Sequence, residues 1–139
     1  MVSLSDVYSS NSLISSTFPS GLVAVFVGAT SGIGEITLKK FAKYTHQPRA
    51  YFIGRSQDAA DRIVAQCKVL NPAGEYIFIK ADVSLIRIID EVCKEIKAKE
   101  KGLNILFLSA GVPGLDRSGM TYRIYLVLPQ ISIKLRTPS

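Results

Sequence analysis

A glycine-rich segment, GATSGIG at residues 28–34, directly follows an apolar run at residues 22–27. The apolar run predicts a strand that is buried on both faces, as in a parallel sheet covered by helices. A helix that begins right after such a strand points its unpaired N–H groups and the positive end of its dipole out of the carboxyl edge of the sheet. Because this arrangement binds phosphate groups, the segment predicts a nucleotide-binding turn.

The residue types within the segment suit that chemistry. Gly28 would make the turn off the strand, Gly32 would let the backbone approach a diphosphate, and Gly34 would let the helix pack closely on the sheet. Thr30 and Ser31 add hydroxyl donors. A glycine turn without a ligand is the alternative, but a position between the first strand and the first helix of a βαβ unit favours nucleotide binding. A P-loop is disfavoured, because no Gly-Lys-Ser/Thr follows.

Strands and helices must alternate to position such a turn. Apolar, β-branched and aromatic runs predict strands at residues 22–27, 50–53, 76–80 and 103–108. Amphipathic patterns predict a helix after each of the first three strands. Since crossovers of this kind are right-handed, we expect an α/β fold, namely a three-layer doubly wound (Rossmann) parallel sheet with strand order 3-2-1-4.

Two local expectations concern the helices. The helix at residues 33–44 should pack on the sheet through one stripe of side chains, which comprises Ile33, Ile36, Thr37, Phe41 and Tyr44. Ser56 can cap the second helix and Ser84 the third, because serine hydroxyls accept hydrogen bonds from the free amides of a first turn.

The composition places the chain among globular proteins and excludes several functions. Hydrophobic residues make up 47% and charged residues 20% of the 139 residues, and no apolar run approaches the roughly 18 residues of a membrane span. The net charge of +6 is concentrated at residues 117–139, without the motif or basic face of a nucleic-acid-binding protein. Cys67 and Cys93 have no metal-site spacing, and His46 lies in a predicted loop. We expect a cytoplasmic protein with no metal site.

Three regions are expected along the chain. Residues 1–20 form a loose N-terminal arm, with one short helical turn near residues 4–10. Residues 21–116 form the nucleotide-binding domain. Residues 117–139 form a poorly specified basic tail, because turn residues and prolines interrupt the alternating pattern there.

The glycine segment and three later stretches resemble the short-chain dehydrogenase/reductase family, in the style of its fungal members. The family's glycine motif is T-G-x-x-x-G-x-G, and here Val27 replaces the threonine. The stretches are GRS at residues 54–56, ADV at 81–83 and LSAG at 108–111, where Ser109 replaces the second Asn of N-N-A-G. The resemblance covers residues 22–111.

The resemblance implies a nicotinamide dinucleotide cofactor. Arg55 favours NADP(H), since a guanidinium suits the oxygens of a 2′-phosphate where an acid would suit a ribose hydroxyl; NAD(H) stays open, as does a plain surface role for Arg55. Ser56 can assist the phosphate or only cap its helix. The expected cofactor-binding residues are Gly28, Thr30, Ser31, Gly32, Ile33, Gly34, Arg55, Ser56, Asp82, Val83, Ser109, Ala110 and Gly111.

Catalytic residues of the family are not recognised in the sequence. The family uses a serine and a Tyr-x-x-x-Lys pair on a helix after the fourth strand, and the sequence ends at Ser139 before such a pair occurs. The one Tyr-x-x-x-Lys, Tyr76 to Lys80, lies on a predicted strand, where residues four apart are not adjacent. We therefore expect a chain truncated after the fourth strand, with the C-terminal half of the usual fold missing.

These observations lead to two hypotheses for function. The first is the NADP(H)-binding portion of an oxidoreductase that transfers hydride between nicotinamide and a small organic carbonyl or alcohol, not catalytic as this chain. The second is a non-enzymatic nucleotide-sensing or interaction module. In both, the fourth strand would have an unpaired apolar edge, through which we expect two copies to associate unless the segment at residues 122–128 covers it.

Overall fold

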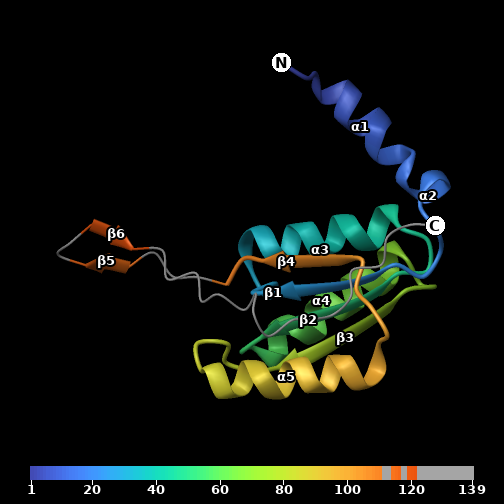
Figure 1. The fold of residues 1–139 in the computed structure, drawn as a ribbon. Coiled ribbons are helices and arrows are strands. Elements are labelled where there is room, and N and C mark those ends of the chain that lie inside the picture. Colours follow the sequence, from blue (N-terminus) through green and yellow to red (C-terminus); the bar gives the residue numbers. More distant parts are fainter. Residues whose placement is uncertain (111–113, 117–118, 122–139) are drawn as a thin grey trace.

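The computed structural model describes residues 1–110, 114–116 and 119–121. Its body is a four-stranded parallel sheet in the order β3-β2-β1-β4, with helices on both faces (Figure 1). This arrangement confirms the predicted doubly wound sheet and its strand order.

The elements of the body alternate along the chain as expected. They are β1 (Val23–Val27), α3 (Gly32–Tyr44), β2 (Arg49–Gly54), α4 (Gln57–Leu70), β3 (Glu75–Lys80), α5 (Ile86–Lys99) and β4 (Ile105–Leu108). Two short strands, β5 (Gly114–Asp116) and β6 (Gly119–Thr121), pair with each other in a separate antiparallel sheet. The rest of the predicted basic tail, with residues 122–128, lies outside the described residues.

Hydrophobic side chains fill both faces of the sheet. On one face, Phe26 and Phe52 pack with Leu38 of α3 and Ile63 of α4. On the other face, alternate residues of the same strands pack against α5. All five residues of β1 are buried, as the uninterrupted apolar run predicted, because a central parallel strand is covered on both sides.

The register brings the carboxyl ends of the four strands to one edge. Val27 of β1 lies opposite Ile53 of β2 and Leu108 of β4. Ile53 in turn lies opposite Ile79 of β3. The segments that follow these residues therefore meet at the same end of the sheet, which is where open α/β sheets bind ligands.

The buried face of α3 differs from the predicted one. Gly34, Leu38, Phe41 and Ala42 are buried, whereas Ile33 and Ile36 are 74% and 60% exposed. Of the predicted stripe, only Phe41 lies in the core. The physical reason is the close approach of Gly34 to the sheet, which fixes the rotation of the helix and turns the two isoleucines outward.

The start of α5 also differs from the prediction. Its N-cap is Leu85, and no side chain caps the first turn. The Ser84 amide instead donates to the Asp82 carboxylate at 3.0 Å. Such a bond makes an Asx turn, so the helix begins after the position expected from the serine.

The N-terminal arm contains more helix than the sequence indicated. Two helices, α1 (Leu4–Ser12) and α2 (Ile14–Thr17), precede β1, and neither has a buried residue. Figure 1 shows α1 projecting away from the body. The arm joins the body at the Gly21 amide, which donates to the His46 carbonyl at 3.0 Å.

Candidate functional site

Gly28 makes the turn between β1 and the helix that follows. Its φ is +82°, in the left-handed region that side chains disfavour. A Cβ atom at this position would lie only 2.6 Å from the Ala110 amide nitrogen. The end of β4 therefore touches the turn, and only glycine fits there.

The first turn of α3 presents free donors to open space. Its N-cap is Ser31, whose hydroxyl makes no capping bond. Among the described residues, no hydrogen bond is formed by the Gly32, Ile33 and Gly34 amides. Gly32 has φ +58°, and a Cβ built on it would meet no atom of the described residues within 4 Å. Gly32 and Ile33 are exposed, so an anion of matching size can approach this turn.

Gly34 and Ser109 join α3 to the end of β4. A Cβ on Gly34 would overlap the Gly28 carbonyl oxygen and would lie 2.5 Å from the Ser109 Oγ. That hydroxyl donates to the Gly28 carbonyl at 3.1 Å and is also placed 3.3 Å from the Val27 carbonyl. The serine that replaces the expected asparagine thus braces the turn through the protein itself.

The segment after β2 lies beside the turn. Gly54 lies against Thr30. A Cβ atom built on Gly54 would be only 2.9 Å from the Thr30 Oγ1. The Ser56 hydroxyl caps α4, since it accepts from the Ala59 amide at 3.3 Å, which is one of the two roles the sequence left open. Arg55 is exposed, so its guanidinium can reach a ligand at this edge.

Asp82 follows β3 at the same edge. Its side chain accepts from the Ser84 amide at 3.0 Å. The pKa of the Asp82 carboxyl is lowered, mainly by its hydrogen bonds with Ser84 and to a smaller degree by the charge of Arg55. The ends of β2 and β3 lie side by side, because Gly54 pairs with Lys80.

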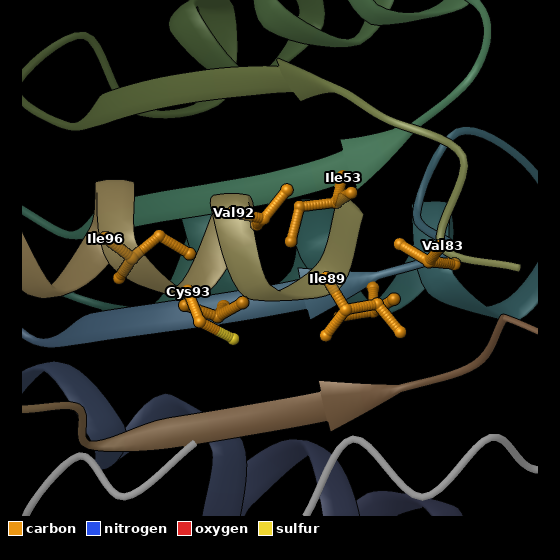
Figure 2. A pocket seen from close by; sticks show the side chains of 8 residues that line it. Ile53, Val83, Ile89, Val92, Cys93 and Ile96 are labelled. Carbon is orange, nitrogen blue, oxygen red and sulfur yellow. The ribbon is translucent and has the colours of Figure 1, made fainter. Parts of the chain in front are cut away.

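Val83 points away from this polar edge. Figure 2 shows its side chain in the wall of a small cavity between α5 and the sheet. The cavity measures about 20 Å³ and has only apolar walls. The lining residues are Val25, Val27, Ile53, Val83, Ile89, Val92, Cys93 and Ile96. An apolar space of this size belongs to the core and offers no group that could bind a polar ligand.

Most of the predicted site residues therefore gather at one end of the sheet. The turn at residues 28–34, the ends of β2 and β3, and Ser109 with Ala110 all lie there, while Gly111 lies outside the described residues. Ile33 is in the first turn of α3 with its side chain exposed.

Sequence reasoning missed an ionic cluster beside the turn. Glu35 accepts hydrogen bonds from Lys39 on its own helix and from Arg62 on α4. Glu35 and Lys39 are four residues apart on one helix, and this spacing could have predicted the ion pair between them. No sequence rule would have added Arg62, because it comes from another helix.

The rejected Tyr-x-x-x-Lys pair lies on β3. The Tyr76 hydroxyl donates to the Asn71 carbonyl at 2.9 Å, and burial raises the pKa of Tyr76 to about 12. Within the part of the chain that the structure describes, no three His, Cys, Asp or Glu side chains come together as a metal site would need. No helix of that part is long and apolar enough to cross a bilayer.

Comparison with known proteins identifies one family. A family model described as short chain dehydrogenase matches residues 22–124. The oxidoreductase andH of Emericella variicolor is 40% identical over 111 residues, which are 80% of this chain and 33% of that protein. The NmrA-like family domain-containing oxidoreductase notO of an Aspergillus species is 45% identical over 113 residues, 80% of this chain and 34% of that protein.

Solved structures share the fold. The L-sorbose reductase of Gluconobacter frateurii, determined as a complex with NADPH and L-sorbose, superimposes with a TM-score of 0.61 at 26% identity. The match covers 68% of this chain and 35% of the reductase. The chain thus spans about a third of the length of the curated relatives.

Proposed function

Because the chain belongs to the short-chain dehydrogenase family, we propose that residues 21–116 bind NADP(H) as the cofactor domain of an oxidoreductase. The whole protein would transfer hydride between the nicotinamide and a small organic carbonyl or alcohol. The contribution of this chain would be to hold the cofactor.

One observation carries the proposal. Among the described residues, the amides of Gly32, Ile33 and Gly34 have no hydrogen-bond acceptor, and no atom lies within 4 Å of a Cβ built on Gly32. Unpaired amides at a helix N-terminus, with the positive end of its dipole, form a donor set that fits a diphosphate. The exposed Gly32 and Ile33 carry no charged side chain that would repel a diphosphate, so the residues present fit the group.

Arg55 supports NADP(H) over NAD(H). It follows β2 directly, at the position where dinucleotide-binding folds meet the adenosine ribose. An acid there would accept hydrogen bonds from a 2′-hydroxyl, whereas a guanidinium donates to phosphate oxygens. Asp82, at the end of β3, is proposed to face the adenine, and its bond to Ser84 fixes its carboxylate. Ser109 would act by bracing the turn.

The chemistry of the bound cofactor would be hydride exchange at its nicotinamide ring. The residues of this chain would bind its diphosphate at α3, orient its adenosine half at the ends of β2 and β3, and hold the turn rigid from β4. The Tyr76 hydroxyl is committed to Asn71, so no proton transfer is assigned to it.

Nucleotide titration tests the proposal. NADPH and NADH are added to the 139-residue chain, and thermal unfolding is followed by circular dichroism. Saturation at about 100 times the dissociation constant should stabilise the fold by about 2.7 kcal/mol, with NADPH effective at the lower concentration. If neither nucleotide raises Tm, the binding function is wrong; if NADH binds more tightly, the role given to Arg55 is wrong.

The alternative is a nucleotide-sensing module without catalysis. It is favoured by the position of Tyr76 and Lys80 on a strand, where residues four apart are not adjacent. Turnover of NADPH by the 139-residue chain with carbonyl substrates would exclude it. Cytoplasmic location and association of two copies through β4 stay predictions.

A further inference from the structure

The first turn of α3 carries an acidic side chain directly after the glycine segment. Glu35 follows Gly34, the last glycine of the segment that is proposed to bind the diphosphate, and the Glu35 side chain is only 14% exposed. An unbalanced carboxylate at this place would repel a diphosphate, because charges interact over about 10 Å at moderate ionic strength.

Two cations hold that carboxylate. Arg62 donates through Nη1 to Oε1 at 2.7 Å and through Nη2 to Oε2 at 3.1 Å. Lys39 donates to Oε1 at 2.5 Å. These hydrogen bonds, from Arg62 first and then from Lys39, lower the pKa of Glu35 to about 2. Glu35 is therefore ionised at neutral pH, and the cluster carries one negative and two positive charges.

We propose that Arg62 and Lys39 are positioning residues for the cofactor site. They bind the Glu35 carboxylate and keep it against α4. The Glu35 cluster (Glu35, Lys39 and Arg62) then has a net positive charge, which attracts the diphosphate. This inference rests on the proposed function. The inference extends that function, because it makes the affinity for the cofactor depend on residues that do not touch the cofactor.

A purely structural clamp between α3 and α4 is the competing explanation. Arg62 belongs to α4, the helix that begins just after Arg55 and Ser56, so the same bonds also fix how the two helices lie. The two explanations predict different orders of affinity. If the charge of the Glu35 cluster controls binding (charge control), the affinity for NADPH follows the net charge of that cluster. If the cluster is only a clamp, every variant that breaks the bonds between Glu35 and Arg62 binds NADPH more weakly.

Four proteins separate these explanations. Glu35→Gln raises the cluster charge to +2, the unmodified chain has +1, and Arg62→Ala lowers it to zero. The double variant Glu35→Gln/Arg62→Ala returns the charge to +1. Dissociation constants for NADPH are measured by isothermal titration at low ionic strength, at a temperature where circular dichroism shows each variant folded.

Affinity should follow the charge. Arg62→Ala should bind NADPH on the order of three- to tenfold more weakly than the unmodified chain, and the double variant should recover that loss. Raising the ionic strength to about 1 M, where the screening length is about 3 Å, should bring the four constants together. Arg62→Lys, which keeps the charge without the two-pronged bond, should bind like the unmodified chain.

A matched control comes from α5. Lys99 donates to Glu95 at 2.8 Å in an exposed pair on the other face of the sheet. Lys99→Ala removes one cation just as Arg62→Ala does, and should leave the NADPH constant within about twofold, since exposed charges beyond the screening length interact weakly.

The outcomes distinguish this inference from the function on which it rests. If the double variant binds as weakly as Arg62→Ala, or if Glu35→Gln binds more weakly than the unmodified chain, charge control is wrong while the cofactor function stands. If the unmodified chain binds neither NADPH nor NADH, the proposed function fails and the inference falls with it.

Discussion

The substitution Gly32→Ala should separate cofactor binding from folding. Gly32 has φ +58°, and within the part of the chain that the structure describes the added methyl group would meet no atom within 4 Å. The left-handed conformation costs a residue other than glycine about 1–2 kcal/mol, which corresponds to a fall in Tm of about 4–8 °C for a domain of this size. The fold should survive, but the methyl group would project into the space proposed for the diphosphate.

Thermal unfolding with and without NADPH measures both effects. The unmodified chain should gain about 2.7 kcal/mol at about 100 times its dissociation constant, whereas Gly32→Ala at the same concentration should gain almost nothing. The matched control is Gly21→Ala. Gly21 has φ +80° and also has no atom within 4 Å of an added Cβ, but it lies before β1, at the other end of the sheet.

The control should lose similar stability and keep the response to NADPH. If Gly32→Ala is stabilised by NADPH as strongly as the unmodified chain, the open space in front of the α3 amides is not the cofactor site. If Gly21→Ala loses the response as well, the effect comes from backbone strain and the reasoning about that space is refuted.

Three further predictions follow from the geometry. Arg55→Glu should weaken NADPH binding at least about tenfold and favour NADH, because a carboxylate repels the 2′-phosphate; equal constants for NADPH before and after the change would contradict this. Because the pKa of Glu35 is lowered to about 2, its stabilising effect should be complete above the ordinary value of 4.5 and should disappear as the pH falls toward 2; urea unfolding of the unmodified chain and Glu35→Gln should converge at low pH, and a constant difference would refute it. Ile105 on β4 is 39% exposed, so size-exclusion chromatography should show concentration-dependent association through this strand, which Ile105→Lys should weaken; a monomer at all concentrations would oppose it.

Much of the fold could be predicted from the sequence because its signals are local. The apolar run of β1 and the glycine segment after it identify a strand and a turn without reference to any distant residue. The alternation of strands and helices, with the fixed hand of their crossovers, then gives the strand order. The position of the candidate site at one end of the sheet follows from that order.

The details of packing could not be predicted in the same way. The rotation of α3 is set by the contact of Gly34 with Gly28 and Ser109, residues that come together only in the folded sheet. Glycine at position 34 was itself a usable signal, since Leu38, Phe41 and Ala42 lie on the same face. Ser84 was predicted as a cap because a serine hydroxyl suits the start of a helix. In the structure the Ser84 amide donates to the Asp82 carboxylate in a turn, and α5 begins after that turn.

The sequence by itself determined which strands and helices build the four-stranded body and which edge of its sheet carries the free amides of α3, because hydrophobic pattern and chain chirality act between near neighbours. Only the tertiary structure decided that Ser109 braces the turn and that Arg62 neutralises Glu35. Those contacts join residues far apart in the chain, and their geometry exists only once β4 and α4 lie beside the first βα unit.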